Sequence, residues 1–266
     1  MRFRVLGPVE IETGEGFQAT PKALKLRSLL AYLCVHRGEA VSSSRLTEAL
    51  WSGAPPRTAS TALHVYVSKL RKHLDGLGLD ASSVITTQPP GYRLNPGDYT
   101  LDVAELDTLL TTAAELRRRG CPERASQVLG RAVSLWQGRA LEDLRELPLF
   151  DSIGRQLDER LSFAQEQRFE IELELGNHKG IVGELYSLVD DRPTWENLHE
   201  YLMLALYRGG RTAEALSIFD RIRRNLVGEF GIEPAPRLQR LHHAVLTHDP
   251  SLGAHFELSG TAARSI

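Results

Sequence analysis

The chain has 266 residues and a formal net charge of −2, and 42% of its residues are hydrophobic, which is enough for two modest cores. The sequence contains no run of 18 apolar residues and no N-terminal signal peptide, so we expect a cytoplasmic protein without a membrane partner. Two cysteines, Cys34 and Cys121, do not make a disulfide framework or a metal site, and we expect no cofactor.

The charge is distributed unevenly along the chain. Residues 1–96 contain 12 Lys and Arg and 7 Asp and Glu, a net charge of +5. The remaining residues contain 20 basic and 27 acidic side chains, a net charge of −7. A basic front part suits a polyanion such as DNA, and the acidic rear part does not. A chance split between two domains is the alternative explanation.

The N-terminal segments predict a small sheet followed by a first helix. Phe3 to Gly7 and Val9 to Ile11 alternate like short strands, which we expect to pack on the helices after them. Residues Pro21 to His36 carry leucines at helical spacing, with Thr20 as the expected N-cap and Pro21 in the first turn.

Two more helices and a hairpin complete the predicted N-terminal domain. A short second helix, Arg45 to Trp51, is expected to be capped by Ser43 or Ser44, and a long third helix covers Thr58 to Leu74. Val84 to Leu94 then predicts two short β runs joined by Gln-Pro-Pro-Gly. Three helices with a turn before the third predict a helix-turn-helix unit, and the hairpin predicts its wing.

The third helix has an apolar stripe and a polar, basic side. The stripe recurs at three- and four-residue steps and consists of Leu63, Tyr66, Val67, Leu70 and Leu74. The opposite side offers the groups that contact base edges, thymine methyls and phosphates. The residues expected to meet bases or nearby phosphates are Thr61, His64, Val65, Ser68 and Lys72. Those expected to position the phosphates are Arg57, Thr58, Lys69 and Arg71, with Thr58 also placed as N-cap. A helix whose outer side is merely solvated is the alternative.

The hairpin and the second helix add further candidate contacts. Arg93, beside Gly91 and Tyr92, is the expected wing cation for the minor groove or its phosphates. Tyr92 is a candidate contact as well, with packing of the wing onto the third helix as the alternative. Ser43, before the second helix, completes the set of candidate DNA-binding residues.

The rear part is predicted to be entirely helical and internally repetitive, with three helix pairs before a last helix from Pro236 to Leu246. The pairs are Ala104–Arg119 with Pro122–Trp136, Gln156–Leu175 with His178–Val189, and Trp195–Tyr207 with Thr212–Leu226. The third pair shows tetratricopeptide-like spacing in Tyr207, Gly210, Ala213, Ala215 and Phe219. Stacked pairs leave a concave surface that suits a protein partner, whereas in the alternative view the individual residues serve packing alone.

Along nearly its whole length, the chain resembles a known family. Segments typical of the OmpR-type DNA-binding domain of the Streptomyces antibiotic regulatory proteins are RVLGPVEI, PKALKLRSLLAYL, RLTEALW, ASTALHVYVSKLRKHL and PPGYRL. From Asp102 to about Leu246 the chain is similar to the bacterial transcriptional activation domain that follows in those proteins. The segments that carry this second resemblance are ERASQVLGRAVSLWQGRAL and LHEYLMLALYRGGRTAEALSIFDRIRRNLVGEFGIEPAPRLQRLHHAVL. The chain is similar to the small members that have no nucleotide-hydrolysing domain.

The resemblance implies a fold and a domain arrangement. We expect a mostly α protein with a small β component, in which a winged helix-turn-helix precedes an all-α, tetratricopeptide-like helical repeat domain. The expected limits are 1–98 for the DNA-binding domain, 99–250 for the activation domain and 251–266 for a flexible tail. We expect the connector around residues 95–98 to let the winged domain reorient, and a fragment of residues 1–98 to fold and bind DNA alone, though more weakly than the full chain.

The resemblance also implies a programme of transcriptional activation. Proteins of this kind bind double-stranded promoter DNA at direct repeats near the −35 element, and they recruit RNA polymerase through its sigma factor and other subunits. By the same resemblance, the regulated genes belong to an antibiotic or other secondary-metabolite cluster. We expect a dimer or two copies on DNA, and a nucleoid-associated protein in the cytoplasm.

Two other function classes compete with this hypothesis. The first is a helical-repeat adaptor whose winged domain binds protein and whose DNA contact is incidental. The second is an enzyme, but the sequence has no GxxxxGK[ST] phosphate loop, no GxGxxG after a strand, no HExxH and no GxSxG. The local cluster of His242, His243 and His248 places neighbours on different sides of a helix, so we expect no metal site and no catalytic residue.

Overall fold

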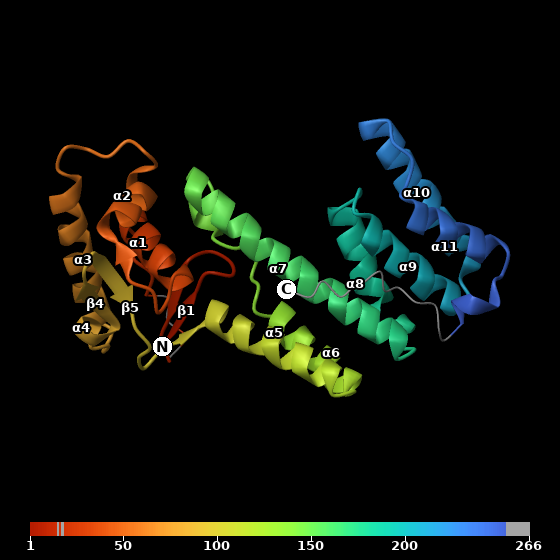
Figure 1. The fold of residues 1–266 in the computed structure, drawn as a ribbon, viewed down its shortest axis with the longest axis horizontal. Helices are drawn as coiled ribbons and strands as arrows, with labels where there is room; N and C mark the ends of the chain where they lie inside the picture. The colour runs from red at the N-terminus through yellow and green to blue at the C-terminus, as the bar shows by residue number, and fades with distance from the viewer. Residues whose placement is uncertain (15, 17–18, 254–266) are drawn as a thin grey trace. The chain divides into compact units, whose positions relative to one another are not determined.

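A computed structural model describes residues 1–14, 16 and 19–253 of the chain (Figure 1). The described part is mostly helical, with two three-stranded sheets in its N-terminal region. This confirms the predicted fold class, in which a small β component precedes a long series of helices.

The chain folds into two compact units. The first unit consists of residues 1–112 and 131–163, and the second consists of residues 113–130 and those from 164 on. The boundaries between the two units fall inside helices, so the units are compact regions and do not correspond to functional domains. The domain limits at residues 98 and 250 therefore stay predictions.

The first sheet joins the start of the chain to the segment after the wing. Strand β1 (Arg2–Arg4) pairs antiparallel with β2 (Glu10–Glu12) and parallel with β6 (Thr100–Leu101). Phe3 and Ile11 lie opposite each other in this register, and both are fully buried. Both predicted strands are confirmed, the first in shorter form and the second shifted by one residue, whereas the two-residue strand β6 was not predicted.

Three helices pack on one another to form the core of the first unit (Figure 1). They are α1 (Leu24–Val35), α2 (Ser43–Trp51) and α3 (Ala59–Asp75). Each was predicted, and their buried leucines interdigitate because leucine at three- and four-residue steps places one stripe of a helix in a core. The helix-turn-helix prediction is confirmed in its architecture.

The start of α1 differs from the prediction. The helix begins at Leu24 with Ala23 as N-cap, and no side chain caps it. The hydroxyl of Thr20, the expected cap, instead accepts a hydrogen bond from the backbone N–H of Ile11 at 3.0 Å. Thr20 therefore stabilises the end of β2 and not the helix.

The caps of α2 and α3 also differ in detail. The hydroxyl of Ser42 accepts from the backbone N–H of Arg45 and caps α2, a position that was predicted for Ser43 or Ser44. Thr58 is the N-cap residue of α3, as predicted, but its side chain forms no capping hydrogen bond.

The wing is a hairpin of β4 (Ile85–Gln88) and β5 (Gly91–Leu94), as predicted, after a short helix α4 (Ala81–Val84). Strand β3 (Val41–Ser42) pairs with the other edge of β5, which gives the order β3-β5-β4. Only glycine fits the first position of β5, because a Cβ there would lie 2.0 Å from the carbonyl oxygen of the first β3 residue.

The connector after the wing is held by hydrogen bonds. The side-chain amide of Asn95 donates to the carbonyl oxygen of Ser83 at 2.9 Å and to Oγ1 of Thr86 at 3.0 Å. The hydroxyl of Tyr99 donates to the carbonyl oxygen of Asn95 at 2.5 Å. These bonds hold Asn95 against the wing, and reorientation of the winged domain about residues 95–98 stays a prediction.

A buried carboxylate joins the first sheet to helix α5. Asp102 is 1% exposed, and its oxygens accept backbone N–H groups of Val5 at 2.7 Å, Leu6 at 2.8 Å and Val103 at 2.7 Å. Burial raises the pKa of this carboxyl, and the three N–H groups oppose that effect. Asp102 and β6 lie beyond residue 98, so a fragment of residues 1–98 would lack these contacts, and its independent folding stays a prediction.

The remaining described chain is helical, which confirms the prediction for the rear part. Its helices are α5 (Asp102–Arg118), α6 (Pro122–Val133), α7 (Pro148–Glu174), α8 (His178–Asp191), α9 (Glu196–Arg208), α10 (Thr212–Phe230) and α11 (Pro236–Leu246), with 3-10 turns η1 (Glu142–Leu144) and η2 (Pro250–Leu252). Helix α7 starts eight residues earlier than predicted, at Pro148 instead of Gln156. Helix α10 continues to Phe230, past the predicted end at Leu226.

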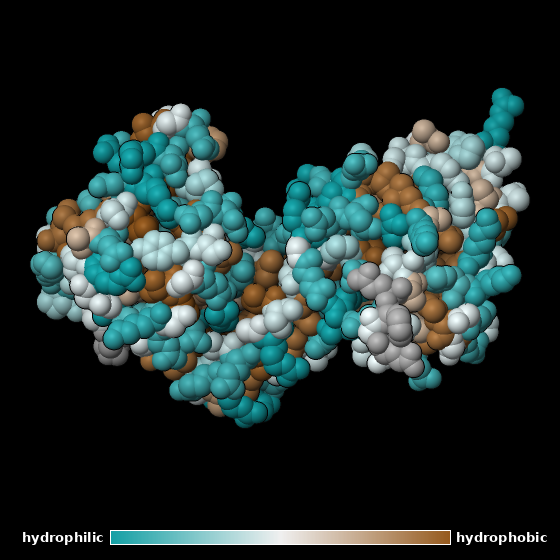
Figure 2. Space-filling model, turned by 180° about the vertical axis from the view of Figure 1, so that it is seen from behind, coloured by the Kyte–Doolittle hydropathy of each residue, from teal (hydrophilic) through white to brown (hydrophobic). Residues whose placement is uncertain are grey.

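Helix α9 lies at the centre of the second unit, where it contacts α8, α10 and α11. Ala215 and Phe219, which belong to the tetratricopeptide-like spacing, are buried in this core, so packing accounts for both. On the face shown in Figure 2, hydrophilic residues separate the small hydrophobic areas. Of the expected tail at 251–266, Leu252 is buried within η2 and residues 254–266 lie outside the described residues.

Candidate nucleic-acid interface

Helix α3 presents one stripe of exposed side chains away from the core. Leu63, Val67, Leu70 and Leu74 are buried, as predicted, and Tyr66 is half-buried against Trp51 at a ring distance of 6.0 Å. The exposed stripe on the other side consists of Thr61, Val65, Ser68 and Lys72. These positions recur at three- and four-residue steps, so they share one face of the helix.

The composition of this face suits base readout. Val65 is 45% exposed, and its methyl groups provide the apolar contact that a thymine methyl group requires. Thr61 and Ser68 carry hydroxyls, which can both donate and accept hydrogen bonds, and Lys72 adds an ammonium group. Between residues 57 and 72 the chain contains four Lys and Arg and no Asp or Glu. A B-DNA major groove admits an α-helix with such a face.

His64 and Tyr92 connect the helix to the wing. Nδ1 of His64 and the hydroxyl of Tyr92 lie 2.6 Å apart and share a hydrogen bond. Tyr92 is 4% exposed, and burial raises the pKa of its hydroxyl, so this group is neutral at pH 7. The structure therefore gives Tyr92 the packing role that was the alternative in the sequence analysis. His64 is exposed on α3, and only its Nε2 lacks a partner among the described residues.

Arg71 uses its donors within the chain. Its Nε and Nη2 donate to the carbonyl oxygen of Ile85 at 2.9 and 2.6 Å, and Nη2 also donates to Oγ1 of Thr87 at 3.1 Å. The guanidinium carbon lies 5.8 Å from the centre of the Tyr92 ring. These contacts tie α3 to strand β4, a positioning role that differs from the phosphate contact predicted for Arg71.

Arg93 and Ser43 lie apart from the exposed stripe. Arg93 is half-buried on β5 opposite Thr86, and because side chains alternate along a strand it faces away from the side on which Tyr92 meets α3. Ser43 donates from both its hydroxyl and its backbone N–H to the carbonyl oxygen of Pro90, each at 3.1 Å. Ser43 thus fixes the turn of the wing to the start of α2.

The remaining predicted phosphate contacts are exposed at the edges of α3. Arg57 and Thr58 precede the first turn of the helix, and Lys69 lies beside Ser68 on its outer side. A helix N-terminus favours a phosphate oxygen there, because its first backbone N–H groups have no partner within the helix. The Thr58 hydroxyl makes no capping bond and so can donate to a phosphate.

Sequence reasoning missed one exposed cation near the wing turn. Arg45 lies in the first turn of α2, two residues after Ser43, and its guanidinium carbon is 5.8 Å from the centre of the Tyr32 ring. Arg45 also lies beside His36. Burial lowers the pKa of the His36 imidazole most, and the positive charge of Arg45 lowers it further. Proximity of Arg45 to the wing follows from pairing of β3 with β5, which the sequence does not reveal.

Within the described residues, no group of three or more His, Cys, Asp or Glu side chains could hold a metal ion. Nor does any described helix combine the length and the apolar character that are needed to cross a membrane.

Two family models match the chain. The model described as "Transcriptional regulatory protein, C terminal" matches residues 15–94, and the model described as "Bacterial transcriptional activator domain" matches residues 101–246. The second match alone covers more than half of the chain. The order of the two matches is the order that the structure shows, with the winged helix before the helical part.

Curated relatives match over nearly the whole chain. The transcriptional regulatory protein EmbR of Mycobacterium tuberculosis is 33% identical over 264 residues, which cover 99% of this chain and 68% of EmbR. The regulatory protein DnrI of Streptomyces peucetius is 34% identical over 257 residues, which cover 95% of this chain and 94% of DnrI. The regulatory protein AfsR of Streptomyces coelicolor is 35% identical over 266 residues, but the chain spans only 26% of AfsR.

A solved structure has the same architecture. The structure of Mycobacterium tuberculosis EmbR in complex with a low affinity phosphopeptide matches with a TM-score of 0.85 at 33% sequence identity. The match covers 94% of this chain and 65% of the EmbR chain, so the chain spans just under two thirds of that structure.

Proposed function

The chain belongs to the Streptomyces antibiotic regulatory protein family of transcriptional regulators, and from this premise we propose that it activates transcription by binding promoter DNA through α3. The observation that carries the proposal is the exposed stripe of Thr61, Val65, Ser68 and Lys72 on a helix whose other side is anchored in a core. We assign DNA binding to residues 1–98 and activation to residues 99–250.

Each side chain near this stripe takes a role that follows from its contacts. Thr61, Val65 and Ser68 meet base edges in the major groove, and Lys72 meets a base or a nearby phosphate. His64 presents Nε2 to the groove, because its Nδ1 is held by Tyr92. The side chains that hold the duplex by its phosphates are Arg57, Thr58 and Lys69.

The contacts of the wing support this assignment. Arg71 and Tyr92 join the hairpin to α3, and Ser43 joins its turn to α2, so the wing and the recognition helix keep one relative position. Preorganisation of this kind lowers the ordering cost of binding. Arg71, Tyr92 and Ser43 therefore act by positioning, and Arg93 lies outside the base-reading face.

The family supports the further steps of the proposal. Two copies bind direct repeats near the −35 element, and the helical part contacts RNA polymerase, including its sigma factor. Direct repeats require a head-to-tail arrangement of the winged domains, because a two-fold pair would require an inverted repeat. The regulated genes form an antibiotic or other secondary-metabolite cluster. Promoter DNA and the polymerase lie in the bacterial cytoplasm, so this function carries a cytoplasmic, nucleoid-associated location.

Binding of the purified full chain to its own promoter region and to unrelated DNA, at two salt concentrations, tests the proposal. We expect tighter binding to the promoter at both salt concentrations, because base contacts add to the salt-dependent phosphate term. Equal affinity for both DNAs at both salts would instead favour the helical-repeat adaptor, in which DNA contact is incidental.

A further inference from the structure

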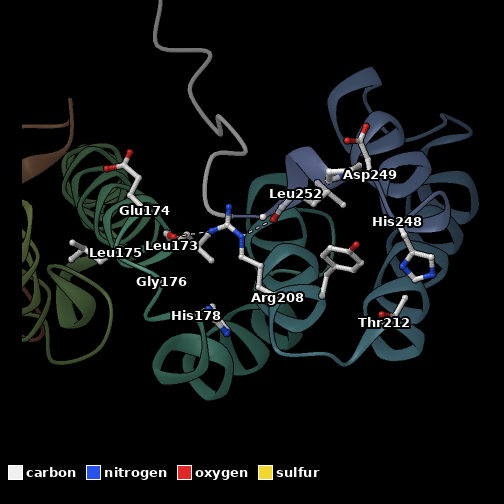
Figure 3. A pocket seen from close by; sticks show the side chains of 13 residues that line it. Leu173, Glu174, Leu175, Gly176, His178, Arg208, Thr212, His248, Asp249 and Leu252 are labelled. Carbon is white, nitrogen blue, oxygen red and sulfur yellow. Dashed lines mark hydrogen bonds between the residues drawn. The ribbon is translucent and has the colours of Figure 1, made fainter.

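An open cavity of about 710 Å³ lies in the second unit, where the ends of several helices meet (Figure 3). The end of α7, the start of α8, the end of α9 and the start of α10 line it, and residues 248–253 close one side. This volume falls within the range of roughly 300–1,000 Å³ that is typical of small-molecule sites. The cavity is lined by residues of the second unit, whereas α3 belongs to the first, so it is a different site from the DNA-reading face of the proposed function.

Arg208 lies in the middle of the lining and has no carboxylate partner among the described residues. Its Nε donates to the carbonyl oxygen of Leu252 at 3.0 Å, and its Nη1 donates to the carbonyl oxygen of Leu173 at 2.7 Å. The third guanidinium nitrogen, Nη2, forms no hydrogen bond with the described residues, and Figure 3 shows it directed between Leu173 and Leu252. Burial lowers the pKa of Arg208, and no anion opposes that effect. A partly buried cation without an anion is costly unless a ligand supplies one.

The carboxylates that line the cavity are engaged elsewhere. Glu174 accepts from Arg117 at 2.8 Å, and Asp249 accepts from the backbone N–H of Ser251 at 2.8 Å. Figure 3 shows both carboxylates pointing away from Arg208. The acidic residues of the lining therefore leave the charge of Arg208 facing the cavity.

Two further basic groups lie on the same side. His178 lines this cavity and an adjoining one of about 960 Å³, and Lys179 lines the adjoining cavity beside Arg208. Burial lowers the pKa of His178 most, and the nearby charges of Arg208 and Lys179 lower it further. The charges of Arg208 and Lys179 thus create a positive potential at one end of the cavity, which attracts an anion, and the neutral His178 imidazole can donate a hydrogen bond to it.

The other end of the cavity is a ring surface. Tyr207 and His248 both line it, with ring centres 6.2 Å apart and planes inclined by 32°. Flat rings pack on such surfaces in offset or edge arrangements. The cavity therefore combines an aromatic wall with a cationic end.

We propose that this cavity binds a small organic anion in which a carboxylate or phosphate group is attached to a flat ring. The anionic oxygens accept from Nη2 of Arg208 and from His178, in the charge-assisted geometry for which a guanidinium is suited. The ring lies against Tyr207 and His248. Such a ligand supplies the anion that Arg208 lacks within the described chain.

Titration of the full chain with four probes by isothermal calorimetry tests this site. Benzoate and phenyl phosphate carry both an anion and a ring, inorganic phosphate lacks the ring, and benzylamine reverses the charge. We expect binding of benzoate or phenyl phosphate that is at least about tenfold tighter than binding of the other two probes, because benzylamine loses the charge-assisted contact and inorganic phosphate loses burial of the ring. Preference for the phosphate over the carboxylate identifies the anionic group. Equal binding of benzylamine and benzoate would overturn the proposal.

Three variants locate the site. Arg208→Gln should weaken binding of the ring anion at least about tenfold, through loss of the guanidinium. Arg208 also holds two backbone carbonyls, so Thr212→Trp serves as a second variant that fills the cavity from the start of α10 and leaves those bonds intact. Arg224→Gln removes an exposed cation of α10 that does not line the cavity, and it should leave binding unchanged. Undiminished binding by Thr212→Trp, or an equal loss in Arg224→Gln, would contradict the assignment.

Discussion

Replacement of Arg71 by Ala separates a positioning role from a direct phosphate contact. In the structure this guanidinium donates twice to the carbonyl oxygen of Ile85, a fully buried residue, and once to Thr87. Removal of the side chain leaves a buried carbonyl oxygen without these donors and releases strand β4 from α3. The prediction is that Arg71→Ala destabilises the first unit and weakens DNA binding without altering its salt dependence.

The size of the effect follows from the contacts that are lost. A hydrogen bond to a charged group contributes about 1.5–3 kcal/mol, and an unsatisfied buried acceptor costs about 1–3 kcal/mol. These two figures describe the same contact and do not add, so we expect a loss of about 2–3 kcal/mol in the stability of the first unit. DNA affinity falls for cognate and unrelated sequences alike, because the wing no longer keeps its position beside α3.

Lys72→Ala provides the matched comparison, since Lys72 is an exposed cation one residue further along the helix. If it contacts a phosphate, its loss reduces the slope of log affinity against log salt by about 0.9 and leaves stability within about 0.5 kcal/mol of the wild type. The assays are urea unfolding and DNA binding over a series of salt concentrations. A reduced salt slope together with unchanged stability in Arg71→Ala would refute the positioning role and restore the phosphate contact.

Ser68→Ala should reduce the difference in binding free energy between cognate and random DNA by about 1–3 kcal/mol, measured by competition binding. An unchanged difference would remove Ser68 from the residues that read the base sequence. Gly91→Ala should destabilise the wing by a few kcal/mol, measured by thermal melting, because the added Cβ would lie 2.0 Å from the Val41 carbonyl oxygen. A wild-type melting temperature would show that β3 and β5 can move apart at no energetic cost. Burial lowers the pKa of His199 to about 4, so between about pH 4 and 6.5 the unfolded chain binds a proton at this residue and the folded chain does not. The free energy of unfolding should therefore be unaffected by this residue above about pH 6.5 and should fall by up to roughly 3 kcal/mol as the pH drops towards 4. His199→Gln should remove this part of the pH dependence in urea unfolding at several pH values, and an unaltered profile would assign the dependence to other groups.

The spacing of apolar residues and glycines along the sequence predicted those parts of the fold that depend on a single helix. Leu63, Val67, Leu70 and Leu74 marked the buried side of α3, because a stripe at this spacing can only face a core. In the rear part, Gly120, Gly176 and Gly210 marked helix ends correctly, and all three have positive φ angles, which glycine adopts readily. The start of α7 was missed although Pro148 is a typical first helical residue.

The parts that escaped prediction depend on contacts between distant segments. Strands β3 and β6 have two residues each, too few for any alternation, and they exist because β5 and β1 offer free edges. The candidate interface also depends in part on contacts between distant segments. The exposed stripe could be predicted from helical spacing, but the roles of Arg71 and Tyr92 depend on how the hairpin docks on α3.

The central claim is that two copies of this chain read promoter DNA in tandem through α3 and activate transcription. Transcription with purified RNA polymerase on templates that differ only in the spacing of the two repeats tests it most directly. Insertion of about five base pairs turns one site to the opposite face of the duplex, and insertion of about ten restores the face. We expect activation on the natural spacing, its loss with about five added base pairs, and partial recovery with about ten. Equal activation on all three templates, or none on the natural one, would contradict it.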